Sequence, residues 1–140
     1  MDKKLYIIDN FYKNPDAVRK LALRAPYEDV TNLNYPGDQS KFAYTSNGVK
    51  EKFESIIRCS IETDESTMTF GKFRIMRDDE RSWLKVHVDG ISDWTAVIYL
   101  NPNESCQGGT AFYQHKETHL EGPPSFNELS RMGFNAYAEF

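Results

Sequence analysis

With 140 residues the chain has the size of one domain, and at that length a folded protein can bury roughly two thirds of the surface that it exposes when unfolded. Its composition is 39% apolar and 14% aromatic, with charges of both signs along the chain, which argues against intrinsic disorder. A formal net charge of -4 without a long basic cluster argues against nucleic acid or an anionic lipid surface as a partner. We therefore expect a single globular domain over residues 1–140.

The hydropathy pattern does not predict a membrane segment. Apolar runs stay well short of the roughly 20 residues that a membrane helix needs, and the apolar stretch near the N-terminus is too short for a signal peptide. Cys59 and Cys106 lie far apart and outside any Cys-x-x-Cys pair, which argues against a thiolate zinc site. We expect a cytoplasmic protein with free thiols.

The N-terminal segment predicts a short β-rich run followed by a helix. Leu5 to Asp9 is apolar and rich in β formers. Asn14-Pro15-Asp16 supplies a helix cap, a proline suited to the first turn and an acid that favours that turn. The apolar residues that follow recur at helical spacing: Val18, Leu21, Ala22 and Ala25. Pro26 should end this helix.

The next stretch predicts a loop and then a second helix. Residues 27–48 are polar and aromatic without a sustained period, and Tyr35-Pro36-Gly37-Asp38 is typical of a turn, so we expect a long surface loop. Loops of this length are often functional. Ser46 or Asn47 can cap a helix whose apolar stripe consists of Val49, Phe53, Ile56 and Ile57.

The second half of the chain changes to short β-rich segments separated by turns. We expect strands at residues 68–76, 83–89, 94–101 and 110–115. Such a series predicts an antiparallel sandwich or barrel, and hence an α+β fold that is mainly β.

His87 and Asp89 are the candidates for chemistry. They lie two apart in the expected strand Lys85-Val86-His87-Val88-Asp89, and residues two apart in a strand point to the same face. An imidazole nitrogen and a carboxylate oxygen, joined by a second histidine, form a facial triad that holds iron(II) and leaves positions open for a 2-oxoacid and dioxygen. Taken alone this spacing is weak evidence, because polar residues often alternate on half-exposed strands.

Further along the chain, two other pieces follow His87-Val88-Asp89 in a characteristic order. They are Ala96-Val97-Ile98-Tyr99-Leu100-Asn101 and Gly108-Gly109-Thr110-Ala111-Phe112-Tyr113. Their order and spacing resemble those of the iron(II)- and 2-oxoglutarate-dependent oxygenases, especially the prolyl hydroxylase-like branch. The opening residues 7–19 also look like the start of small oxygenases of this kind, so the resemblance covers about the whole chain and is specific in its central third.

The resemblance implies that His87 and Asp89 are two of three iron ligands and that Tyr99 contacts 2-oxoglutarate. It implies a double-stranded β-helix (jelly roll) with two N-terminal helices packed on the sheet. The implied cofactor is Fe(II), the cosubstrate is 2-oxoglutarate, and the implied activity is that of a dioxygenase (hydroxylase) acting on a small molecule or a peptide. A core position is an equally ordinary role for Tyr99.

The third iron ligand and a basic residue for the far carboxylate of 2-oxoglutarate have no counterpart at the positions that the family uses. His115 and His119 precede Gly122-Pro123-Pro124, and we expect their stretch to be a loop. The sequence predicts at most five strands, against the eight of a jelly roll, and stops in an aromatic stretch. We therefore expect an incomplete domain that is inactive by itself and leaves a sheet edge open for association.

Two other functions stay open. A non-catalytic binding or assembly module with the same β scaffold would lack a complete iron site. A cupin-like metalloenzyme would combine His87 with His115 or His119 and need no 2-oxoglutarate. The sequence does not determine the substrate or the oligomeric state, because fold resemblance does not fix a substrate.

Overall fold

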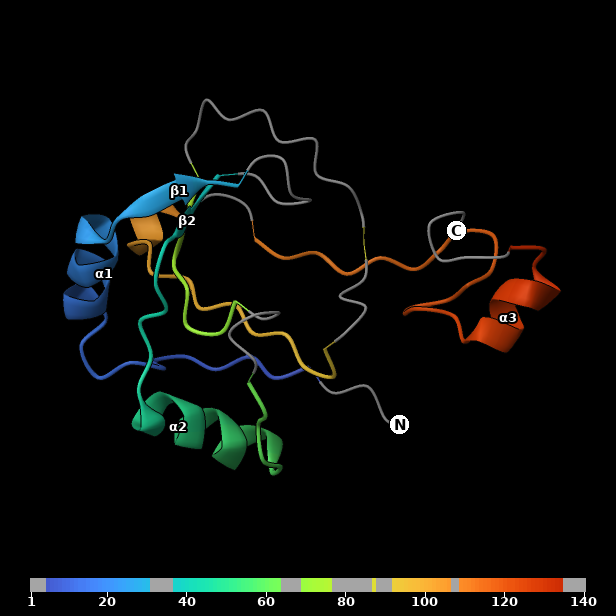
Figure 1. Cartoon of the computed structure of the whole chain (residues 1–140), viewed down its shortest axis with the longest axis horizontal. Helices are drawn as coiled ribbons and strands as arrows, with labels where there is room; N and C mark the ends of the chain where they lie inside the picture. Colours follow the sequence, from blue (N-terminus) through green and yellow to red (C-terminus); the bar gives the residue numbers. More distant parts are fainter. Residues whose placement is uncertain are drawn as a thin grey trace. The chain divides into compact units, whose positions relative to one another are not determined.

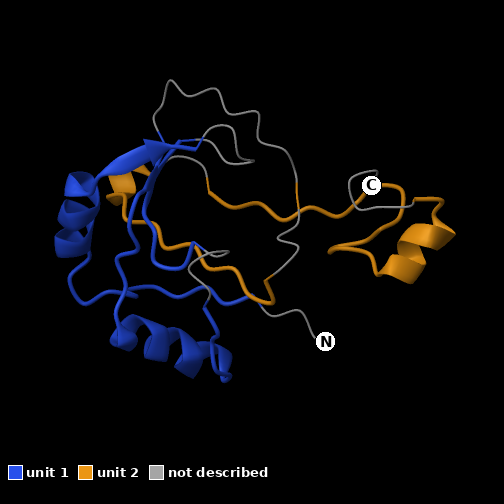
Figure 2. Ribbon diagram, viewed as in Figure 1, with its two compact units in different colours: residues 1–85 blue, residues 86–140 orange. Residues whose placement is uncertain are grey.

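The computed structural model describes residues 5–30, 37–63, 69–76, 87, 92–106 and 109–134. It divides into two compact units, residues 1–85 (unit 1) and residues 86–140 (unit 2), which Figure 2 shows in different colours. Among the described residues, no helix has the length and apolar character to cross a membrane. The single domain expected from the chain length stays a prediction.

Helix α1 (Pro15–Arg24) forms where the sequence predicted it (Figure 1). The Asn14 side chain accepts a hydrogen bond from the backbone N–H of Ala17 at 3.0 Å, and Pro15 stands in the first turn, where its missing N–H costs no hydrogen bond. The last turn closes where the N–H of Ala25 donates to the Ala22 carbonyl. Of the expected apolar stripe, Ala22 is buried and Val18 and Ala25 are half-buried, whereas Leu21 is 48% exposed, so the stripe is only partly covered.

The second predicted helix is confirmed as α2 (Asn47–Ile57). Of the two candidate caps, Ser46 and Asn47, the residue that caps the helix is Ser46. The Ser46 hydroxyl accepts a hydrogen bond from the N–H of Val49 at 3.4 Å. Arg58 ends the helix in the left-handed region with φ 58°, and its N–H donates to the Glu54 carbonyl. Phe53 is half-buried, and its ring packs on Phe11, with centroids 4.8 Å apart.

A three-stranded antiparallel sheet in the order β1-β2-β3 completes unit 1. Its strands are β1 (Tyr27–Asp29), β2 (Asp38–Ser40) and β3 (Arg74–Ile75), with Tyr27 opposite Ser40 and Asp38 opposite Ile75. The expectation of a structureless loop over 27–48 is therefore wrong for β1 and β2. Strands of three residues are too short to show the alternation that a sequence pattern requires.

Two polar residues of β2 are buried, and their side chains form hydrogen bonds within the sheet region. Ser40 has no exposed surface, and its hydroxyl accepts a hydrogen bond from the N–H of Phe73 at 2.9 Å and donates to the Phe42 carbonyl at 2.8 Å. Gln39, which is also buried, accepts a hydrogen bond from the guanidinium of Arg74 at 3.1 Å. Because Ser40 bonds to backbone groups and Gln39 bonds to Arg74, both side chains can be buried without losing their hydrogen bonds.

Unit 2 contains two helical elements in its described residues, the 3-10 helix η1 (Asn103–Ser105) and helix α3 (Phe126–Arg131). α3 starts with a capping box in which Ser125 and Glu128 bond each other's backbone N–H, and it buries Leu129. The sequence analysis did not predict this helix.

The described stretches 92–106 and 109–134 contain no β-strand, which differs from the strands expected at 94–101 and 110–115. A strand is defined by a hydrogen-bonded neighbour, so β-branched and aromatic residues alone do not create one. The strand expected at 83–89 lies outside the described residues except for His87. The jelly roll therefore stays a prediction.

Candidate metal and cosubstrate site

His87 is the one predicted iron ligand that the structure describes, and its side chain is exposed. Asp89 lies outside the described residues, so the prediction that both side chains share a face is untested. An imidazole nitrogen and a carboxylate oxygen are donors that iron(II) accepts. The donor types of His87 and Asp89 therefore fit iron as two ligands of a set of three.

The described residues do not complete such a set. Within the part of the chain that the structure describes, no group of three His, Cys, Asp or Glu side chains is arranged to hold a metal ion. His115 and His119 are both described, and with His87 they form no such group.

The Tyr99 side chain is the candidate contact for 2-oxoglutarate. It forms a hydrogen bond with the side chain of Thr110. The Tyr99 hydroxyl lies 2.7 Å from Thr110 Oγ1, and either atom can be the donor. One of the two hydroxyls donates its proton to the other. Whichever hydroxyl is the donor, the O–H of the second hydroxyl stays available to donate to a further acceptor. Both side chains are exposed, and the hydrogen bond joins the second and third pieces of the oxygenase-like sequence.

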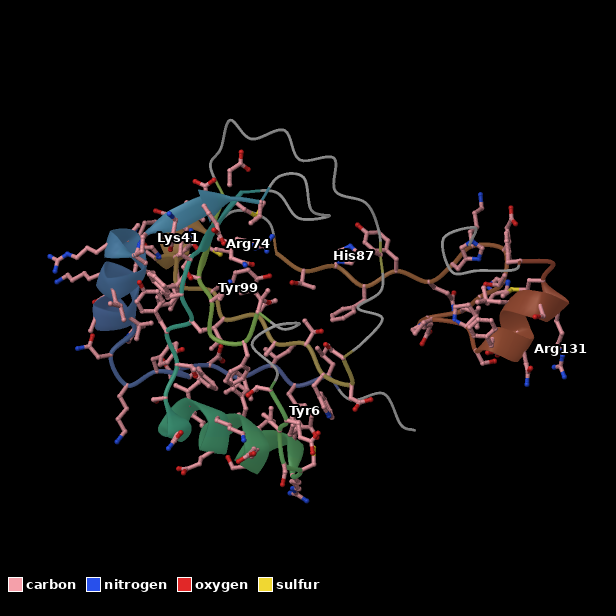
Figure 3. The ribbon with its side chains drawn as sticks, in the orientation of Figure 1. Tyr6, Lys41, Arg74, His87, Tyr99 and Arg131 are labelled. Atoms are coloured by element: carbon pink, nitrogen blue, oxygen red, sulfur yellow. The ribbon has the colours of Figure 1, made fainter. Side chains whose placement is uncertain are left out.

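Figure 3 shows Tyr99 and His87 on separate stretches of unit 2, standing apart from each other. The structure thus brings Tyr99 to Thr110 and does not bring it to His87. The sequence analysis named Tyr99 and missed Thr110. The available signal was the position of Thr110 directly after the glycine pair, where a polar side chain interrupts an otherwise apolar segment.

The stretch that contains His115 and His119 was predicted to be a loop, and in the structure it is a tight turn. The N–H of His115 donates to the Leu120 carbonyl at 2.7 Å, and the N–H of His119 donates to the His115 carbonyl at 2.8 Å. The Nδ1 atom of His115 lies 2.8 Å from Thr118 Oγ1 and accepts from the Thr118 N–H at 3.3 Å. These bonds give the His115 ring a structural role in shaping the turn.

Comparison with known proteins places the chain in one family. A family of unknown function (DUF6445) matches residues 1–131. The chain belongs to this family. No curated protein and no solved structure matches it. Since the function of the family is itself unknown, membership leaves the chemistry of His87, Asp89 and Tyr99 to be argued from the residues.

Proposed function

We propose that this protein is an Fe(II)- and 2-oxoglutarate-dependent dioxygenase. The observation that carries the proposal is the hydrogen bond between Tyr99 and Thr110. It links the two sequence pieces that follow His87-Val88-Asp89 in the order seen in such oxygenases. The donor chemistry of His87 and Asp89 supports it further, because one imidazole and one carboxylate are two of the three ligands that a facial triad needs.

In this proposal His87 and Asp89 hold the metal. The His87 side chain is exposed to solvent. Bound iron would supply the activation of dioxygen that the side chains of the protein cannot perform.

The Tyr99–Thr110 pair holds a carboxylate of 2-oxoglutarate. Its remaining O–H donates to a carboxylate oxygen, and such charge-assisted hydrogen bonds are about twice as strong as neutral ones. The 2.7 Å hydrogen bond between the two hydroxyls thus orients the one O–H that donates to the carboxylate.

The overall reaction consumes the substrate R–H, dioxygen and 2-oxoglutarate and releases R–OH, succinate and carbon dioxide. One oxygen atom enters the product and the other enters succinate. The substrate is a small molecule or a peptide.

Anaerobic titration of the whole chain with Fe(II) tests the metal ligands. We expect His87→Ala and Asp89→Ala each to weaken binding at least about tenfold, as loss of a ligand from a small site should. His115→Asn is the matched control, because asparagine keeps an acceptor near the position of Nδ1 and preserves the turn. Equal binding by the wild type and by both ligand variants would refute the assignment.

Addition of 2-oxoglutarate separates the competing functions. In the proposed enzyme, a visible charge-transfer band appears only when iron and 2-oxoglutarate are both present, and Tyr99→Phe combined with Thr110→Val weakens it. Iron binding that ignores 2-oxoglutarate and is lost in His115→Asn would instead favour a cupin-like site. No iron binding at all would favour a non-catalytic module, in line with the missing third ligand among the described residues.

A further inference from the structure

A hollow of about 530 Å³ lies in unit 1, on residues that the proposed oxygenase chemistry does not use. α1 contributes Val18 and Leu21 to its lining, and the segment between β2 and α2 contributes Ala43 and Tyr44. None of the described residues that line it carries a charge, and its polar groups are hydroxyls. Its size is within the range of small-molecule pockets, roughly 300–1,000 Å³.

The aromatic wall of the hollow is positioned by contacts between distant parts of the sequence. The rings of Tyr44 and Phe73 stack with centroids 5.1 Å apart and an interplanar angle of 25°. The N–H of Tyr44 donates to the Gly71 carbonyl at 2.8 Å, and the N–H of Phe73 donates to the buried Ser40 hydroxyl at 2.9 Å. Because both backbones are fixed, the stacked rings are in place before any ligand arrives.

Tyr12 adds a polar group to this apolar wall. Its side chain is half-buried, and this burial raises the pKa of the phenol, which therefore stays neutral at physiological pH. Among the described residues, no hydrogen-bond partner lies at its hydroxyl, while its ring is held edge-on by Phe11 at 5.1 Å. A neutral phenol in this position can both donate to and accept from a ligand.

We propose that this hollow binds a small neutral aromatic molecule that carries a hydroxyl group. The ring of the ligand packs against Tyr44 and Phe73, in the offset or edge-on geometry that aromatic pairs prefer. Its hydroxyl bonds to Tyr12. A charged ligand is disfavoured, because it would lose hydration at the apolar wall without gaining an ionic partner from the lining. This inference does not rest on the proposed iron chemistry.

Titration of the full chain with p-cresol, followed by NMR, tests the site. We expect saturable shifts at the lining residues, and Ala43→Trp should weaken binding at least about tenfold by filling the hollow. Ala43 is exposed, so the larger ring needs no rearrangement of a buried core. Phe42→Trp is the matched control, because Phe42 is 64% exposed and does not line the hollow, and it should bind p-cresol like the wild type.

Two further comparisons test the chemistry of the ligand. Tyr12→Phe should weaken p-cresol about fivefold and leave toluene unchanged, because it removes a single hydrogen bond. The anion 4-hydroxyphenylacetate should bind the wild type about tenfold more weakly than p-cresol. Absence of saturable p-cresol binding, unchanged binding in Ala43→Trp or in Tyr12→Phe, or equal affinity for the anion would each overturn the proposal.

Discussion

Unit 1 and unit 2 are stabilised by contacts of different range along the sequence. In unit 1 the side-chain hydrogen bonds of Ser40, Arg74 and Lys52 reach partners 33, 35 and 41 positions away. In unit 2 the side-chain bond between Tyr99 and Thr110 spans 11 positions, and those between His115 and Thr118 span 3. Unit 1 should therefore unfold cooperatively, whereas the turns of unit 2 can open locally.

The two units also differ in whether their polar side chains are buried in the fold or exposed as candidates for chemistry. In unit 1 the buried polar side chains of Ser40 and Gln39 form hydrogen bonds within the sheet region. Tyr99, Thr110 and His87 in unit 2 are exposed. Binding residues are commonly found on connecting segments that a rigid scaffold carries.

The largest expected effect is that of Gly37→Ala on unit 1. Gly37 has φ 87°, and a Cβ there would collide with the Ile75 carbonyl, which pairs β3 with β2. We expect a loss of about 3 kcal/mol in the free energy of unfolding, measured by urea denaturation. Gly48→Ala is the control, because a Cβ at Gly48, at the start of α2, would meet only the Ser46 hydroxyl at an ordinary contact distance of 3.9 Å, and alanine favours helix there. Equal stability of the two variants would contradict the described register of the sheet.

A smaller loss is expected for Ser40→Ala. This change removes a fully buried hydroxyl and leaves the part-buried N–H of Phe73 without this acceptor, at a cost of about 2 kcal/mol. Ser60→Ala, at an exposed position outside the sheet, should change the free energy of unfolding very little. If both serines prove equally replaceable, the long-range contacts do not distinguish unit 1 in the way we infer.

Lys52 and Lys50 provide a matched pair within α2. Lys52 is half-buried, its ammonium donates to the Phe11 carbonyl, and it lies 4.4 Å from the centroid of the Phe11 ring. Lys52→Met should cost about 1 kcal/mol in urea denaturation, since it removes a cation–π contact and a charged hydrogen bond. Lys50→Met removes only a 3.7 Å surface ion pair with Glu54 and should cost less than about 0.5 kcal/mol. If Lys50→Met lost more unfolding free energy than Lys52→Met, the contacts of Lys52 with Phe11 would contribute no stability.

The smallest effect is a pH dependence of α3 in unit 2. Hydrogen bonds from the Ser125 hydroxyl and the Ser125 N–H lower the pKa of Glu128 from its ordinary value of 4.5. A carboxyl with a lowered pKa stabilises the folded form above its unfolded pKa, and that contribution is lost as pH falls through the folded value. Cα chemical shifts of residues 126–131 should therefore lose helical character in acid.

Ser125→Ala supplies the reference for this pH profile. It removes the side-chain bond to Glu128, so the helical shifts should be lower at neutral pH and less dependent on acid. Ser130→Ala, exposed in the same helix, keeps the capping box and should retain the profile of the wild type. Identical profiles in the wild type and Ser125→Ala would remove the capping box as the cause.

Features encoded within three or four residues were predictable. Asn14 and Ser46 each cap a helix through an N–H three positions later, so both helix starts could be inferred from local spacing. The turn around His115 followed from the glycine and prolines after it. The start of α3 had the same kind of signal in Ser125 and Glu128, and a search for capping boxes would have found it.

The candidate site was only partly predictable. His87, Asp89 and Tyr99 stand out from the sequence because their spacing and neighbours resemble a known family. The partner of Tyr99 did not stand out, because no local rule connects residue 99 with residue 110. Whether His87 and Asp89 face the same way stays a prediction, since Asp89 lies outside the described residues.

The amino-acid sequence by itself determined the two N-terminal helices, the cap of the first helix and the residue types available for metal chemistry. The tertiary structure decided which short segments pair as β1, β2 and β3, that Ser40 is buried, and that Tyr99 meets Thr110. The physical reason is the distance along the sequence between the residues that interact. Caps and turns are closed by neighbours along the chain, whereas sheet pairing and side-chain meetings depend on which distant segments come together in the fold.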